Sequence, residues 1–213
     1  MKDRMVDVGR FVGGLAEGLD INGYTSDYGP QIPPPPIKFR DLKSEHFYGS
    51  ITNQVAPNRP SVSLLLTWMF SQINTARILV PMIAEQNTVA AFKLRFVTLF
   101  QTTSSLRKLL EEDEESSFLQ PEARDTVSNI LKYDSVLKVY EAKGLRNNLV
   151  HYGVPKRIAS KLSPGLPLFG LVEPYSNGKS FENMRHEVAL GLAYAAHEVR
   201  SLLPQPLTPQ AAM

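Results

Sequence analysis

The chain has 213 residues, of which 43% are hydrophobic and 21% charged, and its 23 basic and 21 acidic side chains give a formal net charge of +2. This length is enough to bury one sizeable core, and the balanced charge excludes a strongly basic nucleic-acid coat protein and an acidic solvating tail. The absence of cysteine excludes disulfides, thiol nucleophiles and cysteine-ligated metal clusters, and it favours a reducing compartment.

The sequence shows no export or membrane signal. Charged residues interrupt every apolar run within the first 20 residues, so the apolar core of a signal peptide is missing. The most apolar segment, 61–84, carries Gln72, Asn74 and Arg77 and is too polar to span a bilayer. We therefore expect a soluble, cytoplasmic protein that does not associate with a membrane.

The first 59 residues predict an irregular N-terminal arm. Glycines recur too densely between residues 9 and 29 for a good helix. The segment QIPPPPIK, residues 31–38, must be extended, because four successive prolines fix φ and favour polyproline II. We interpret it as a stiff arm lying over the core; the alternative is a ligand for an SH3-type domain.

From residue 60 onward the hydrophobic spacing predicts helices. Apolar residues recur every three or four positions from Leu65 to Val80, and Pro81 is expected to kink or end this first helix. A second helix is expected over 88–110. The acidic cluster EEDEESS, residues 111–117, opposes the helix macrodipole there, so part of it is expected to be loop.

A third helix is predicted from Pro121, and its pattern continues through Gly144 to residue 152, before Gly153 and Pro155 supply a stop. The last helix, from about 180 to 203, has the cleanest helical periodicity in the chain. These patterns predict an all-α bundle of about four main helices over 60–203, preceded by the arm (1–59) and followed by a disordered tail (204–213).

Most of the sequence contains no recognisable catalytic, phosphate-binding or metal-binding motif. The sequence has no Gly-rich phosphate loop, no H-E-x-x-H helix, no G-x-S-x-G elbow, and no Glu-x-x-His pair of the kind that binds metals in helical bundles. His186 and His197 lie 11 residues apart, and neither has a metal-ligating partner four residues later, so we interpret both as partly exposed helix residues.

One segment, KGLRNNLVHYGVP over residues 143–155, combines polar groups suited to catalysis. Asn147 and His151, four residues apart on a helix, share a face, and Arg146 reaches around its edge. This arrangement suits a groove between two helices or two subunits. Gly144 is costly inside a helix, so it marks either the close approach of a partner backbone or a kink.

Arg146, Asn147 and His151 form R-N-x-x-x-H, which resembles the R-x4-6-H motif of the HEPN superfamily. The resemblance implies a helical bundle with the motif late in the bundle and a homodimer that pairs two motif copies. It also implies metal-independent RNA cleavage by attack of the ribose 2′-hydroxyl on the adjacent phosphate, without a cofactor. A second match, from Arg40 to His46, follows the proline run and is interpreted as a chance occurrence.

In this reaction His151 would transfer protons, because histidine side chains titrate near neutral pH. Arg146 would stabilise the phosphorane charge, since its planar fork binds phosphate oxygens and stays protonated. Asn147 would orient the imidazole or bind substrate. The expected substrate-binding residues are Lys143, Tyr152, Lys156 and Arg157. For Tyr152 the alternative to stacking on a base is simple packing at the helix end.

Charge supports a nucleic-acid ligand, because seven basic residues face only two acidic ones between residues 132 and 161. The alternative is a solvated basic face without a ligand. Some HEPN toxins carry a tyrosine two residues after the histidine that their nucleotidyltransferase antitoxins modify. Gly153 occupies that position here, which puts this form of regulation in doubt.

The sequence thus predicts a metal-independent endoribonuclease, a toxin or defence effector, that acts on RNA as a homodimer with an antitoxin or other protein as partner. The alternative is a non-catalytic interaction or regulatory module that binds a protein or a nucleotide. A purely structural motif would pair Arg146 with Glu141 or a helix end and use His151 as a cap. Burial of His151 in a monomer core would exclude the nuclease.

Overall fold

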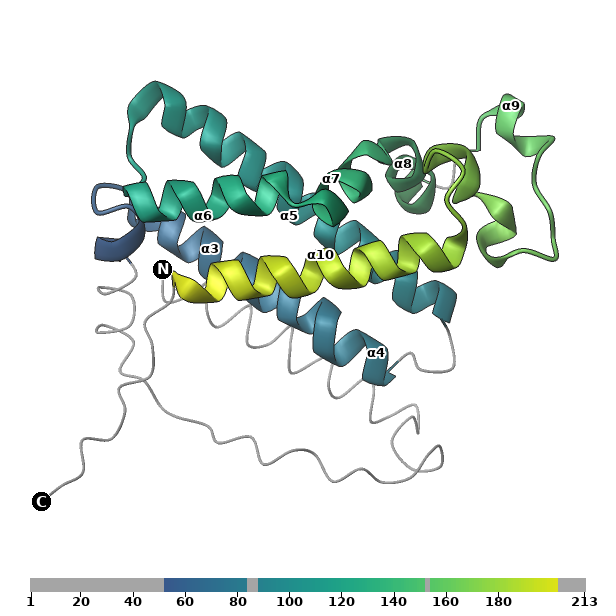
Figure 1. The fold of residues 1–213 in the computed structure, drawn as a ribbon, viewed down its shortest axis with the longest axis horizontal. Coiled ribbons are helices and arrows are strands. Elements are labelled where there is room, and N and C mark those ends of the chain that lie inside the picture. Colours follow the sequence, from purple (N-terminus) through teal and green to yellow (C-terminus); the bar gives the residue numbers. More distant parts are fainter. Residues whose placement is uncertain (1–51, 84–87, 152–153, 203–213) are drawn as a thin grey trace, which may run out of the picture. The chain divides into compact units, whose positions relative to one another are not determined.

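The computed structural model describes residues 52–83, 88–151 and 154–202, and these ranges contain helices and no strand (Figure 1). They all belong to one unit of the chain, Leu42–Met213. The expected all-α architecture is confirmed for this part of the chain. The predictions for the polyproline segment and for the tail 204–213 lie outside the described residues.

The first long helical stretch continues through Pro81. It consists of α3 (Pro60–Asn74), the π-helical turn η1 (Thr75–Leu79) and α4 (Val80–Ile83). Pro81 has no N–H to donate to the carbonyl four residues earlier. The helix widens just before it, so that the N–H of Val80 bonds to the carbonyl of Thr75, five residues back. The interruption expected at Pro81 is therefore a wide turn that precedes it.

Helix α5 (Thr88–Ser116) is the longest described helix, with 29 residues. The acidic cluster is helical up to Ser116, so only its last residue, Ser117, lies outside the helix as expected for part of the cluster. Asp113 is only 1% exposed, accepts a hydrogen bond from the N–H of Leu119 at 2.7 Å and pairs with Arg124 at 2.6 Å. These partners neutralise a charge that would otherwise oppose the helix dipole.

The predicted third helix is in fact three helices, α6 (Pro121–Lys132), α7 (Asp134–Glu141) and α8 (Lys143–His151). Tyr133 breaks the first pair with an extended backbone (φ −66°, ψ 127°), and Ala142 breaks the second (φ −76°, ψ 36°). The ring of Tyr133 stacks on Tyr194 at 4.0 Å. A long-range contact therefore accompanies a break that no glycine or proline marks.

The last helix is confirmed, although it ends slightly earlier than expected. The remaining elements are α9 (Lys156–Ala159), the 3-10 turns η2 (Pro167–Gly170) and η3 (Glu173–Tyr175), and α10 (Phe181–Ser201). Ser180 caps α10 by accepting a hydrogen bond from the N–H of Asn183 at 3.2 Å. Helix α10 packs against α3, α5, α6 and α7 around one core (Figure 1). None of the described helices is long and apolar enough to span a membrane.

Candidate active site

Helix α8 presents the predicted catalytic segment. Its Leu145, Asn148 and Leu149 side chains are buried, and α8 packs on α5 and η3. Lys143, Asn147 and His151 are exposed, and their four-residue spacing sets them on one face. Asn147 and His151 therefore share a face of a helix, as the spacing predicts.

Arg146 lies at the edge of this face and contacts both its neighbour and the protein interior. Its Nη1 donates to Oδ1 of Asn147 at 3.2 Å, and its guanidinium carbon lies 5.9 Å from the ring centre of Phe100 on α5. The Nε atom is buried and has no hydrogen-bond partner among the described residues. Arg146 makes no ion pair with Glu141 or any other carboxylate among the described residues, so this alternative is not observed.

Gly144 allows a close contact within the chain. A Cβ atom at this position would overlap the ring of Tyr175 in η3. A break between α7 and α8 does lie two residues earlier, at Ala142, and the group that approaches Gly144 comes from the same chain. The missing side chain lets η3 pack directly against α8, and this packing holds the motif helix in place.

Asn148 is a polar residue of α8 that the sequence analysis did not single out. It is 5% exposed, and its Nδ2 donates to the carbonyl of Gly144 at 2.8 Å, one turn earlier. Its Oδ1 is buried without a partner. A side chain that bonds within its own helix helps to fix the start of α8, and its position on the apolar side conceals it in a sequence pattern.

The predicted substrate-binding residues are only partly described. Lys143 on α8 and Lys156 at the start of α9 are exposed, and neither forms an ion pair with a described residue. Tyr152 and the side chain of Arg157 lie outside the described residues. The exposed lysines leave positive charge near the motif.

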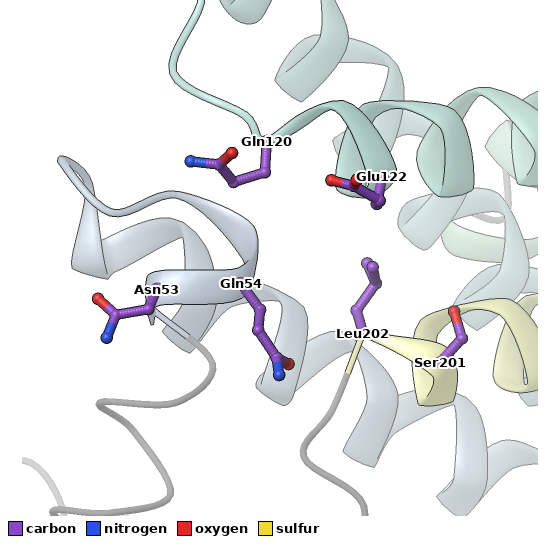
Figure 2. Close-up of a pocket in the computed structure, with 6 residues that line it drawn as sticks. All are labelled: Asn53, Gln54, Gln120, Glu122, Ser201 and Leu202. Atoms are coloured by element: carbon purple, nitrogen blue, oxygen red, sulfur yellow. The ribbon is translucent and has the colours of Figure 1, made fainter.

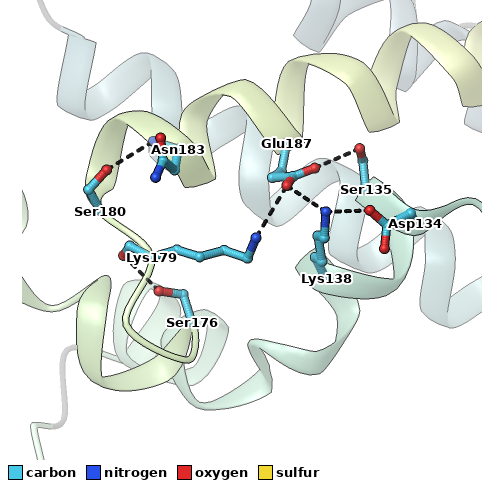
Figure 3. Close-up of polar contacts among 8 residues, drawn as sticks. All are labelled: Asp134, Ser135, Lys138, Ser176, Lys179, Ser180, Asn183 and Glu187. Carbon is cyan, nitrogen blue, oxygen red and sulfur yellow. Dashed lines mark hydrogen bonds and ion pairs between the residues drawn. The ribbon is translucent and has the colours of Figure 1, made fainter.

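The basic run also includes a lysine that the fold neutralises (Figure 3). Lys138 pairs with Glu187 of α10 at 2.8 Å and with Asp134, and Glu187 also accepts from Ser135 at 2.7 Å and from Lys179 at 3.3 Å. The hydrogen bonds that Lys138 donates, to Asp134 first and then to Glu187, raise the pKa of Lys138. Lys138 therefore holds α7 on α10 and is not free to bind an anion.

The structure also has an open hollow of about 320 Å³, whose lining residues are drawn in Figure 2. Its lining residues are Asn53, Gln54, Gln120, Glu122, Ser201 and Leu202. It lies at the C-terminal end of α10, whereas η3, the support of α8, precedes the N-terminal end. The lining residues that the structure describes include no basic or imidazole group, so the hollow does not suit the chemistry expected of the motif.

No metal centre is evident in the part of the chain that the structure describes. There, no three histidine or carboxylate side chains gather closely enough to hold a metal ion. His186 and His197 are exposed on α10 and make no hydrogen bond with a described residue.

Comparison with known proteins gives no family assignment. No protein-family model, no curated protein and no solved structure matches the chain. An assignment of function therefore rests on the motif and on the side chains around it.

Proposed function

We propose that the protein is a metal-independent endoribonuclease of HEPN type, with the reacting groups on α8. One observation supports the proposal most directly: α8 exposes Asn147 and His151 on one face, beside an arginine without a carboxylate partner among the described residues. A histidine buried in the core would have argued against it, and His151 is exposed.

The reaction needs two proton transfers and stabilisation of charge on phosphorus. The ribose 2′-oxygen attacks the phosphate and loses its proton, the P–O5′ bond breaks, and the 5′-oxygen gains a proton. His151 suits either transfer, and Arg146 suits the charge that develops on the phosphate oxygens. One imidazole cannot act as base and acid at the same moment, so a homodimer with two facing copies of α8 supplies both.

The test is incubation of the purified protein with mixed RNA in excess EDTA, beside His151→Ala and Arg146→Ala. His197→Ala is the matched control, because it removes an equally exposed helix histidine. We expect fragments with 2′,3′-cyclic phosphate ends from the wild type and the control, and none from the other two. Equal cleavage by all four proteins would reveal a contaminant, and no cleavage by folded wild type would count against the proposal.

Mixing experiments test the homodimer. When wild-type and His151→Ala subunits have exchanged fully, activity should fall as the square of the wild-type fraction if each turnover needs both imidazoles. A linear fall would show that each subunit acts alone. Sedimentation velocity on the same samples measures the oligomeric state.

A second candidate function, a helical interaction module, is supported by the outer face of α3 and η1. Five large apolar side chains are 38–50% exposed there, namely Leu64, Leu65, Trp68, Ile78 and Leu79. No charged residue occurs between Pro60 and Arg77. A helix that is apolar on both sides is usually covered on both. Trp68→Gln should weaken self-association or partner binding if this face is the site, and should leave RNA cleavage by the assembled protein unaltered.

A further inference from the structure

Four side chains from three helices form a continuous stack, which we call the Arg–aromatic stack: Arg146, Phe100, Tyr140 and Arg107. The Phe100 and Tyr140 rings lie 5.4 Å apart at an angle of 18°. The guanidinium of Arg146 lies 5.9 Å from the Phe100 ring centre, and that of Arg107 lies 4.5 Å from the Tyr140 ring centre. A cation thus lies at each end of an aromatic pair.

Helix geometry explains why the stack forms. Phe100 and Arg107 are seven residues apart on α5, which is two turns, so both lie on the same side of that helix. Tyr140 comes from the last turn of α7, and Arg146 comes from the first half of α8. The break at Ala142 allows the two short helices to bring these residues to one flank of α5.

Both arginines of the stack lack the partner that an arginine usually has in a folded protein. The Nε atoms of Arg107 and Arg146 are buried without a hydrogen-bond partner, and neither arginine forms an ion pair with a described residue. Glu111 follows Arg107 by one turn but does not form an ion pair with it.

A third arginine provides a useful comparison. Arg59 also lies over an aromatic ring, at 4.3 Å from the centre of Phe118, yet a carboxylate oxygen of Glu112 approaches it at 3.8 Å. Stacking on a ring therefore does not prevent pairing with an acid in this protein. Stacking occupies the face of a guanidinium and leaves its edge nitrogens as donors. In Arg107 and Arg146 the Nε atoms are buried, so the donors left for an external anion are the terminal Nη nitrogens, of which Nη1 of Arg146 also donates to Asn147.

We propose that the Arg–aromatic stack binds two phosphates of one single-stranded RNA, with Arg146 at the reacting phosphate and Arg107 at another phosphate along the strand. This proposal adds a substrate-binding residue to the proposed nuclease, and it rests on that proposed function. Phe100 is 7% exposed and Tyr140 is half-buried, so the rings serve to orient the arginines. The planar fork of each arginine matches the bidentate geometry of a phosphate group. Arg107 is thus a substrate-binding residue.

The experiment measures binding separately from cleavage. A fluorescent single-stranded RNA with 2′-O-methyl riboses cannot be cut by 2′-hydroxyl attack, and its affinity is measured by anisotropy at several salt concentrations. The proteins are the wild type, Arg107→Gln, Arg107→Lys and Lys108→Gln. Lys108 is the matched control, since it is the adjacent cation on α5 and is exposed.

For Arg107→Gln we expect the slope of log K against log salt to become shallower by about 0.7, the value for one phosphate contact on a single strand. At about 0.1 M salt this corresponds to about fivefold weaker binding. Arg107→Lys should keep the slope and lose part of the affinity, because it keeps the charge without the planar fork. Lys108→Gln should leave the slope of the wild type.

Two results would overturn the inference: no binding of the oligonucleotide by the folded wild type, or identical slopes for Arg107→Gln and Lys108→Gln. The outcome for the nuclease is separate. If Arg107→Gln weakens binding but the wild type leaves unmodified RNA intact, the stack is an RNA-binding site and the proposed catalysis is wrong. In the cleavage assay, Arg107→Gln should raise KM and leave kcat unchanged.

Discussion

Two groups of cations in this fold have opposite surroundings. Lys138 of α7 and Lys179 of the loop before α10 both pair with the carboxylate of Glu187, and these ion pairs join α7 and that loop to α10. Arg107 and Arg146 meet aromatic rings and no carboxylate among the described residues. The first group is part of the scaffold, whereas the second is the group that we propose binds RNA. The number of basic residues in a segment therefore does not measure how many can bind an anion.

The largest expected effect is on the rate of RNA cleavage, which should depend on Arg146 of the second group and not on Lys179 of the first. Arg146→Ala should lower the rate of RNA cleavage by about 10²–10³-fold, the usual loss when a group that stabilises transition-state charge is removed. Lys179→Gln should leave the rate within about twofold, because its ammonium is committed to Glu187. Single-turnover cleavage of a labelled RNA measures both. Equal losses of cleavage rate in the two variants would contradict the difference between the two groups of cations.

The packing of η3 against α8, the helix that carries Arg146, can be disturbed without changing an arginine. In Gly144→Ala the new Cβ overlaps the ring of Tyr175, so η3 must move away from α8. We expect a loss of about 1–3 kcal/mol in the free energy of unfolding, as is usual for overpacking, which exceeds the gain of about 1 kcal/mol in helix propensity. Gly165→Ala, where no atom lies within 4 Å of the added Cβ, is the control for urea denaturation. A stabilised Gly144→Ala would contradict this account.

The scaffold role of the first group predicts a loss of stability when its acid is neutralised. Glu187→Gln removes the negative charge of the carboxylate to which Lys138, Lys179 and Ser135 donate hydrogen bonds. It should lower the free energy of unfolding by about 1–2 kcal/mol. Glu182→Gln changes an exposed pair on the same helix and should change stability by less than about 0.5 kcal/mol. Chemical denaturation at neutral pH compares them, and similar values for both variants would argue against a scaffold role.

The smallest expected effect is a pH dependence. Burial alone would raise the pKa of Glu187, but hydrogen bonds from Lys138, Ser135 and Lys179 outweigh it and lower this pKa from 4.5 to about 2. Because the folded-state value lies below the unfolded one, the stabilisation is complete above about pH 4.5 and is lost as the pH falls towards 2. Over that window wild-type stability should fall more steeply than that of Glu187→Gln. Parallel curves would show that Glu187 does not contribute.

Long periodic segments were predictable from the sequence, and the breaks between short helices were not. The periodicity of α10 predicts it to within two residues, because its apolar stripe is regular and Ser180 supplies a cap. The break at Tyr133 carries no glycine or proline signal, whereas the break at Ala142 lies two residues before Gly144, a residue that can mark a kink. The acidic end of α5 is helical because Asp113 finds Arg124, a partner from the next helix.

The candidate site was predictable in part. The spacing of Asn147 and His151 was enough to predict a shared helix face, and the structure adds that both residues are exposed. Phe100 and Tyr140 could be identified only as apolar positions, because their contact with Arg146 depends on how α7 and α8 fold back onto α5. Arg107 has no local signal at all. Arg107 becomes a candidate only because the structure places it over the Tyr140 ring without an ion pair to a described carboxylate.

The exposed face of α3 can be monitored by tryptophan fluorescence. Trp68 is the only tryptophan in the chain, and it is 50% exposed on that face. Its indole fluorescence therefore reports on one surface of one helix, with no background from other tryptophans. Whatever covers the α3 face will shift this emission towards the blue and shield it from a soluble quencher. The chain thus carries its own label for docking, at a surface on a different helix from the motif.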